Sequence, residues 1–258
     1  MKRELCLACS QISLVLTLLL SGPAHAQLEL VVDINQASAP DQSAPAQFTA
    51  VGATVIFTAT SGDEGRELWK TDGTTGGTVL LKDIWPGNQS SNPTILAVMG
   101  GTAFFAANDG THGAELWKTD GTTGGTVMVK DIFSGSSSGD PRGGIIFNNT
   151  LFFTAQDYDR NYELWKSDGT EAGTMLVKDL QSNSVNPGSF PQRFVSIGTK
   201  LLFLAYTDTP GLELWSTDGT SAGTTMVKDI TPGNSSAAVD GPSHLNFYNY
   251  TITGKVRY

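Results

Sequence analysis

The sequence predicts an all-β protein of the β-propeller class, built from four-stranded blades. The first observation is a segment of the form Glu-Leu-Trp-x-(Ser/Thr)-Asp-Gly-Thr that occurs four times. Its tryptophans are spaced by 48, 48 and 50 residues, and such a period is typical of stacked structural units. The second is that short apolar, β-branched and aromatic runs alternate with turn-forming residues, whereas no stretch offers a helix. The third is that several runs are apolar on both faces, which predicts sheets covered by neighbours on both sides.

The four strands of a unit follow one another within about 48 residues. In the third unit we expect them at residues 145–147, 150–155, 163–167 and 175–180, with Asn148-Asn149 and Asp168-Gly169 as turns. Complete units are expected at about residues 47–84, 95–132, 145–180 and 194–230. The two extra residues of the last interval fall between residues 180 and 203. This stretch is rich in Gly, Pro, Ser and Asn, so an insertion there disturbs no strand pairing.

The repeated residues are expected to be structural. The tryptophans should insert between blades as core residues: Trp69, Trp117, Trp165 and Trp215. The repeated Asp-Gly pairs should form turns, in which the carboxylate accepts backbone N–H groups and the glycine takes a positive φ. These pairs are Asp72-Gly73, Asp120-Gly121, Asp168-Gly169 and Asp218-Gly219.

A strand register can be predicted from the same spacing. A hairpin about residues 72–77 places Thr71 opposite Thr78, Trp69 opposite Leu80 and Glu67 opposite Lys82. Opposite charges at cross-strand positions would stabilise this register. The other units offer the same pairs: Glu115 with Lys130, Glu163 with Lys178, and Glu213 with Lys228.

The repeated segment, followed by Val-Lys-Asp-Ile in its most typical copy, resembles the ELWxxDGT repeat of secreted bacterial proteins. The resemblance covers about residues 47 to 230, and Ser216 is the main departure, in a position that holds Lys in the other copies. It implies an extracellular β-propeller, often a larger one, with no established catalytic role. It supplies no functional residue that can be carried over.

The two ends of the chain resemble parts of a further unit. Residues 28–34 match its fourth strand and residues 245–258 its first two strands, but the Glu-Leu-Trp strand and the Asp-Gly turn are missing. Two arrangements stay open. The terminal strands complete a thin fifth blade and close a ring, or the chain is a shortened form of a larger propeller whose exposed sheet edge is prone to pair with other chains.

The first 26 residues have the pattern of a Sec-type secretory signal. Lys2 and Arg3 precede an apolar run at residues 12–20, and Ala24-His25-Ala26 forms a small-residue cleavage site before Gln27. The run is too short to span a bilayer, and no other segment could do so. We therefore expect a secreted or cell-surface protein of residues 27–258 without a transmembrane segment. Both cysteines, Cys6 and Cys9, lie in the signal, so the exported chain would have no disulfide.

Composition limits the chemistry. A net charge of −9 and a pI of about 4.7 argue against nucleic acid as a partner, because phosphate binding needs a basic surface. After signal removal only His112 and His244 remain as histidines, and the lack of cysteine excludes Cys-His nucleophiles and Cys-based zinc sites. Carboxylates in the loop between the second and third strands could hold Ca²⁺, or could simply be solvated turn residues. These candidates are Asp63, Asp109, Asp157 and Asp208.

We therefore expect no enzyme, no catalytic residue and no cofactor other than this candidate calcium. The units are too alike for a single active centre, which would need different groups from different blades. The primary hypothesis is a non-catalytic extracellular repeat scaffold for protein or surface interaction. A lectin-like carbohydrate-binding propeller is the alternative, and a propeller-fold glycoside hydrolase a further one. The partner, protein or glycan, is not identified by the sequence.

Overall fold

Four sheets of four antiparallel strands make up the part of the chain that the computed structural model describes, which comprises residues 32, 43–158, 162–181, 188–230 and 232. No helix occurs among these residues. Each sheet runs in sequence order, first strand to fourth, as a meander. The predicted all-β fold of four-stranded units is confirmed, and each sheet is called a blade below.

The strands lie close to their predicted positions. The first blade contains β1 (Ala46–Val51), β2 (Thr54–Ser61), β3 (Gly65–Thr71) and β4 (Val79–Lys82), and the second β5 (Thr94–Met99), β6 (Thr102–Asn108), β7 (Ala114–Thr119) and β8 (Val127–Lys130). The third contains β9 (Arg142–Phe147), β10 (Thr150–Gln156), β11 (Tyr162–Ser167) and β12 (Met175–Lys178), and the fourth β13 (Gln192–Ile197), β14 (Lys200–Thr207), β15 (Gly211–Thr217) and β16 (Thr225–Lys228). Asn148 and Asn149, at φ of 48° and 54°, form the tight turn between β9 and β10.

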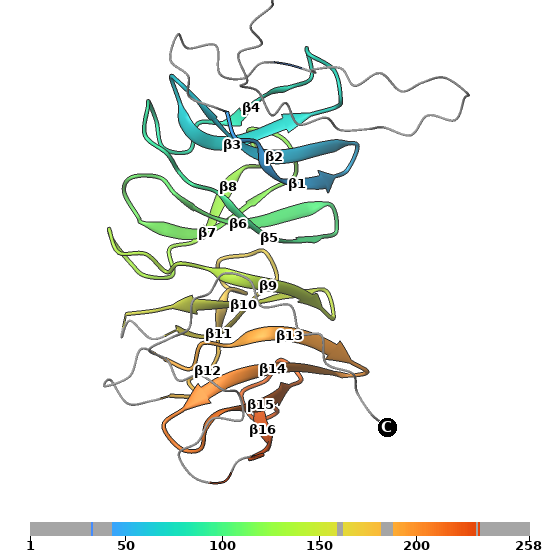
Figure 1. Ribbon diagram of the computed structural model, residues 1–258, viewed down its shortest axis with the longest axis vertical. Helices are drawn as coiled ribbons and strands as arrows, with labels where there is room; N and C mark the ends of the chain where they lie inside the picture. The colour runs from blue at the N-terminus through green and yellow to red at the C-terminus, as the bar shows by residue number, and fades with distance from the viewer. Residues whose placement is uncertain (1–31, 33–42, 159–161, 182–187, 231, 233–258) are drawn as a thin grey trace, which may run out of the picture.

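Figure 1 shows the blades stacked face to face along the long axis, with β1 to β4 at one end and β13 to β16 at the other. The first strands of successive blades, β1, β5, β9 and β13, are neighbours. The predicted signal at residues 1–26 and the predicted terminal strands at 28–34 and 245–258 lie outside the described residues, apart from Val32. Ring closure therefore stays a prediction. No helix long and apolar enough to cross a membrane is found in the described part of the chain.

The hydrophobic core lies between the blades. Leu68 and Leu81 of the first blade pack against Phe105 and Trp117 of the second, and the next two interfaces repeat this arrangement. Each interior interface is therefore filled by a phenylalanine and a tryptophan that are cross-strand partners on β6 and β7, β10 and β11, or β14 and β15. Trp117 and Trp165 are buried at 7% and 6% exposure, whereas Trp69 and Trp215 are partly exposed.

The predicted register is right at the tryptophans and wrong at the glutamates. Trp69 lies opposite Leu80, as expected, but Lys82 lies opposite Leu68 rather than Glu67, because a β-bulge shifts the register between Leu68 and Trp69. The same bulge recurs in each blade, so the other three predicted pairs are also wrong: Glu115 with Lys130, Glu163 with Lys178 and Glu213 with Lys228. A bulge inserts one unpaired residue, and counting along the sequence cannot detect it.

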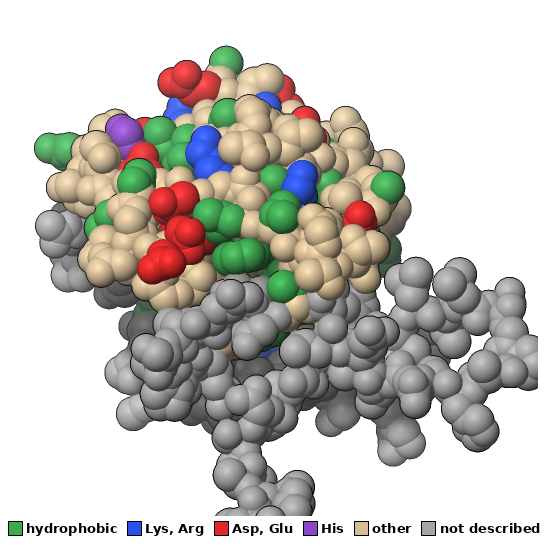
Figure 2. All heavy atoms as spheres, turned by 90° about the horizontal axis from the view of Figure 1, so that it is seen from above, with side chains coloured by type: hydrophobic (Ala, Val, Ile, Leu, Met, Phe, Trp, Pro, Cys, Tyr) green, Lys and Arg blue, Asp and Glu red, His purple; other side chains and the backbone are tan. Residues whose placement is uncertain are grey.

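The lysines instead join one blade to the next. Lys82 Nζ donates to the carbonyl oxygen of Thr126 at 2.8 Å, and Lys178 Nζ to that of Thr224 at 2.8 Å. Lysines of the third strands act in the same way towards the glycine of the following Asp-Gly turn, as Lys118 Nζ does towards Gly169 at 2.9 Å. Corresponding bonds are made by Lys70 to Gly121 and by Lys166 to Gly219. Basic side chains are thus used within the stack, and Figure 2 shows those on the visible face scattered among acidic and hydrophobic ones.

Candidate functional site

In the first three blades the repeated glutamate is a buried carboxylate that fastens the linker to the next blade. Glu163 accepts hydrogen bonds from Leu180 N at 3.0 Å, Ser189 N at 3.1 Å and Ser189 Oγ at 2.5 Å. Ser189 O in turn accepts Tyr206 N of the next blade at 2.7 Å. Burial of the glutamate is therefore compensated by backbone donors, as buried polar groups require. The carboxylate ties its own fourth strand, the linker and the next blade together.

The same arrangement recurs in the first two blades. Glu67 binds Ile84 N at 3.0 Å and Ser91 N at 2.8 Å, and Glu115 binds Ile132 N at 2.7 Å and Gly139 N at 2.6 Å. Glu213 binds Ile230 N at 3.1 Å. Burial raises the pKa of Glu115 and of Glu163 to about 7, although the hydrogen bonds oppose it. The pKa of Glu67 is raised for the same reason. The cause is desolvation, so these shifts do not by themselves indicate catalysis.

The repeated Asp-Gly pairs form turns. In each blade the aspartate Oδ1 accepts the N and the Oγ1 of the threonine two residues later, and for Asp168 these distances are 2.8 Å and 2.7 Å. The hydrogen bonds from that threonine lower the pKa of the aspartate: Asp72, Asp120, Asp168 and Asp218. The following glycine has a φ between 87° and 93° in all four turns, which L-residues adopt at a cost. The hydrogen bonds of these aspartates and the positive φ of these glycines therefore serve to form the turn.

The acidic loops that could bind calcium are not brought together. Asp63, Asp109, Asp157 and Asp208 each lie on their own blade, between its second and third strands. Among the described residues no three acidic, histidine or cysteine side chains form a group that could hold a metal ion. Calcium binding therefore stays a prediction, and nothing in the geometry adds to it.

His112 pairs with Asp109 in the loop of the second blade. Its Nδ1 lies 2.8 Å from Asp109 Oδ2, and Asp109 Oδ1 also accepts the backbone N of Thr111 and of His112 at 2.8 Å each. The hydrogen bond to Asp109 raises the pKa of His112. Burial opposes ionisation of Asp109, but the hydrogen bonds outweigh it and lower its pKa. Among the described residues no hydroxyl is hydrogen-bonded to this pair, and the interaction closes the loop.

A side chain shortly after the fourth strand of one blade contacts the loop between the second and third strands of the next blade. It is Trp85 after β4, Phe133 after β8 and Gln181 after β12. Trp85 packs so closely on Gly110 that a Cβ there would lie 2.5 Å from Trp85 Nε1. Phe133, one blade later, lies 6.2 Å from the ring centre of Tyr158. In the third position Gln181 Oε1 accepts Asp208 N at 3.0 Å. The contact is repeated although the residue type varies, and it forms a rim where adjacent blades meet.

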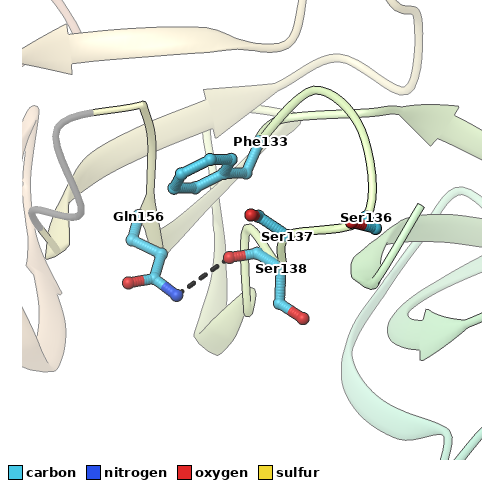
Figure 3. A pocket seen from close by; sticks show the side chains of 5 residues that line it. All are labelled: Phe133, Ser136, Ser137, Ser138 and Gln156. Carbon is cyan, nitrogen blue, oxygen red and sulfur yellow. Dashed lines mark hydrogen bonds between the residues drawn. The ribbon is translucent and has the colours of Figure 1, made fainter.

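A depression of about 370 Å³ opens at this rim between the second and third blades. It is lined by Phe133, Ser136, Ser137, Ser138 and Gln156. Figure 3 shows the Phe133 ring on one side and the Gln156 amide on the other, with Nε2 donating to Ser138 O at 2.8 Å. Tyr158, which is 84% exposed, stands beside Phe133. An aromatic wall, an amide and several hydroxyls can bind a small polar ligand that also has an apolar face.

The buried glutamate of the second blade positions this depression. Glu115 binds Gly139 N, and Gly139 O accepts Gln156 N at 2.8 Å. Ala114 N donates to Ser138 Oγ at 2.9 Å and fixes the other side of the linker. The lining residues thus lie on a linker and a strand end that are both fastened to the core.

Gly113 allows the linker after the second blade to pass close to the backbone just before β7. Its φ is 72°, and a Cβ would lie 2.3 Å from Ser137 O. We expect Gly113→Ala to lower the free energy of unfolding by about 1–3 kcal/mol, since it combines backbone strain with a main-chain collision. Thermal and urea unfolding would measure this. Gly135→Ala is the control, because Gly135 has a φ of 97° but an added Cβ would meet nothing within 4 Å. An equal loss in the two variants would contradict the close approach.

Comparison with known proteins identifies no family. No family model and no curated protein matches the sequence. Among solved structures the chain is similar to a puromycin hydrolase, with 17% identity and a TM-score of 0.43 over 72% of this chain and 29% of that one. It is also similar to the acylaminoacyl peptidase of Pyrococcus horikoshii, with 13% identity and a TM-score of 0.43 over 71% and 27%.

A third similar structure is TolB from Acinetobacter baumannii, with 14% identity and a TM-score of 0.40 over 64% of this chain and 38% of that one. The chain spans between about a quarter and two fifths of these three proteins' lengths. At such similarity the activities for which these proteins are named are properties of those proteins alone.

The depression was not predicted from the sequence. Phe133 and Tyr158 are visible as isolated aromatics, but their partners Gln156 and Ser138 belong to no motif. The one available signal is positional. Trp85, Phe133 and Gln181 stand at the same place in successive units, one residue after the apolar residue that ends the Val-Lys-Asp-Ile segment or its equivalent. Variation at a fixed position of an otherwise regular repeat indicates residues that the scaffold does not need.

Proposed function

We propose that the protein is a non-catalytic extracellular binding module whose stacked blades present variable residues at their rims. The observation that carries this proposal is that the repeated side chains are already engaged in building the fold. The glutamate, the turn aspartate and the lysines all bind backbone groups, and the tryptophans pack between sheets or against them. The side chains at the rim do not belong to this repeated set, and they differ from blade to blade.

A carbohydrate is the partner that the depression fits best. Sugars have an apolar face that packs on aromatic rings and hydroxyls that bond to amides and serines. Phe133 and Tyr158 supply the rings, and Gln156 with Ser137 supplies polar groups at the same opening. The rim contacts between the other blades differ in residue type, so this depression is the one site to which the proposal applies. The rings and polar groups at this opening support the lectin-like form of the proposal over a plain protein scaffold.

Glycan binding tests the proposal directly. A glycan array identifies the ligand, and calorimetry then measures its affinity. We expect Tyr158→Ala and Gln156→Ala to weaken binding about 3- to 10-fold each, the effect of losing one aromatic or amide contact, while Tyr158→Phe changes it little. Gln89→Ala is the control, because Gln89 is an exposed amide on the linker after the first blade. Saturable glycan binding with the same affinity in the parent and in both rim variants would rule out the depression as the binding site. No glycan binding at all would rule out the lectin-like form of the proposal.

A further inference from the structure

The outer face of the fourth blade exposes apolar residues whose equivalents in the other three blades are buried or partly buried. Val227 is 51% exposed, whereas its equivalents Leu81, Val129 and Val177 are at most 6% exposed. Ile230 is 56% exposed, against 4% and 8% for Ile84 and Ile132. On the first strand Ile197 is 62% exposed and its equivalent Phe147 is 5% exposed. Val195, Ile197, Val227 and Ile230 are called the open face below.

In the rest of the stack such a face is covered in one way. The next blade presents a cross-strand pair of phenylalanine and tryptophan to it: Phe105 with Trp117, Phe153 with Trp165, and Phe203 with Trp215. The open face therefore has the shape and chemistry to receive a fourth pair of this kind. Exposed apolar residues gathered on one face of a sheet indicate an interaction surface.

One such pair, on the first blade, covers no other described blade. Phe57 and Trp69 are cross-strand partners on the first blade, and their side of the blade faces away from the second. Trp69 is partly exposed there, and Phe48, stacked on Phe57 at 5.3 Å, is 39% exposed. Figure 1 places the first and fourth blades at opposite ends of the stack. The pair cannot reach the open face of its own molecule in this arrangement.

We propose that a second copy of the chain covers the open face with its first blade, head to tail. Residues 233–258 contain no tryptophan, so they cannot supply the pair that fills the interior interfaces. Lys228 occupies the position from which Lys82 and Lys178 donate to the carbonyl oxygens of Thr126 and Thr224, and the equivalent acceptor on the first blade is Thr78 O. The contact continues the interior interface across two molecules.

Head-to-tail contacts either close a ring or extend into a filament. Two copies would bring together eight blades, which lies within the range of blade numbers known for closed propellers. Ser216 replaces the lysine that makes the second inter-blade bond elsewhere, so this contact lacks one hydrogen bond of the interior ones. We therefore expect it to be reversible and dependent on concentration.

Light scattering after size-exclusion chromatography tests the proposal on the purified chain. We expect a dimer or larger assembly at high concentration. Val227→Lys on the open face, or Phe48→Lys on the first blade, should each give a monomer, with at least a tenfold weaker self-association. Met175→Lys is the control, since Met175 is 44% exposed on β12 of the third blade, outside the open face, and this variant should assemble like the parent. Unfolding midpoints verify that each variant is folded.

Mixing the two variants distinguishes a head-to-tail contact from any other. Each variant alone lacks one side of every contact, whereas a mixture of the two restores one intact contact and should form a 1:1 heterodimer. A parent chain that is monomeric at all concentrations, with Val227 shielded, would overturn the proposal in favour of cover by the chain's own residues 28–34 and 245–258. Unchanged assembly of Val227→Lys, or no heterodimer in the mixture, would overturn it as well.

Discussion

Trp165→Ala is expected to lower the free energy of unfolding by about 3–5 kcal/mol. Trp165 is 6% exposed and packs in the cluster that contains Phe153 and Leu151 of its own blade and Leu116 of the preceding one. Its Nε1 is buried without an acceptor among the described residues, so its contribution is packing rather than a hydrogen bond. Removing the ring leaves a cavity between two sheets, and the hydrogen-bonded backbones of these sheets can move only partly into it. Chemical denaturation would measure the loss.

Two control variants make this result specific. Tyr158→Ala removes an aromatic ring that is 84% exposed and should change stability by less than about 0.5 kcal/mol. Trp69→Ala should cost less than Trp165→Ala, because Trp69 is partly exposed on a face that no other described blade covers. Binding at the rim, measured per folded molecule, should be the same for Trp165→Ala and the parent. An unchanged unfolding midpoint for Trp165→Ala would contradict the core assignment.

The stability of the protein should rise as the pH is lowered from about 8 to about 5. Burial raises the pKa of Glu115 and Glu163 to about 7, while in the unfolded chain these groups titrate near 4.5. The folded state therefore binds more protons than the unfolded state between these values. The stabilisation that comes from protonating Glu115 and Glu163 is fully present below about pH 4.5 and is lost as the pH rises through about 7. On the order of 1.4 kcal/mol accompanies each pKa unit of difference.

Below about pH 4 the trend should reverse. The turn aspartates Asp72, Asp120, Asp168 and Asp218 have lowered pKa values, so their contribution is present above their unfolded pKa and is lost as the pH falls through the folded one. Urea unfolding at a series of pH values should give a maximum between about pH 4 and 4.5. The double variant Glu115→Gln, Glu163→Gln should flatten the rise between pH 8 and 5, and Glu171→Gln, which alters an exposed side chain, should not. A rise of unchanged size in the double variant would contradict this assignment, since only the part due to Glu67 and His112, whose pKa values are also raised, should remain.

The fold was predictable because each of its signals is local and repeated. Apolar runs set the strands, Asn148-Asn149 and the Asp-Gly pairs set the turns, and the 48-residue period set the blades. Pairing of Trp69 with Leu80 followed from the same count and is observed. The predicted pairing of Glu67 with Lys82 is wrong because one bulged residue shifts the register. The spacing of residues in the sequence does not reveal such a bulge.

The candidate site was not predictable in the same way. Phe133 and Gln156 are 23 residues apart and belong to different units, so their proximity depends on how the linker turns between two blades. That turn is fixed by the hydrogen bond from Gly139 N to the Glu115 carboxylate. The sequence does not show that this carboxylate is buried, so the hydrogen bond could not be predicted from it. Loop carboxylates such as Asp63 and Asp157 have the chemistry of calcium ligands, yet the fold keeps them on separate blades.

Amide hydrogen exchange at Ser91, Gly139 and Ser189 tests most directly whether the repeated residues build the scaffold. These amides lie in linkers and donate to the buried carboxylates of Glu67, Glu115 and Glu163. We predict that they exchange as slowly as amides in the centres of the strands, and that Glu163→Ala accelerates exchange at Ser189 alone among the three. Exchange at the rate of exposed loops in the parent protein would show that the glutamates do not fasten the blades.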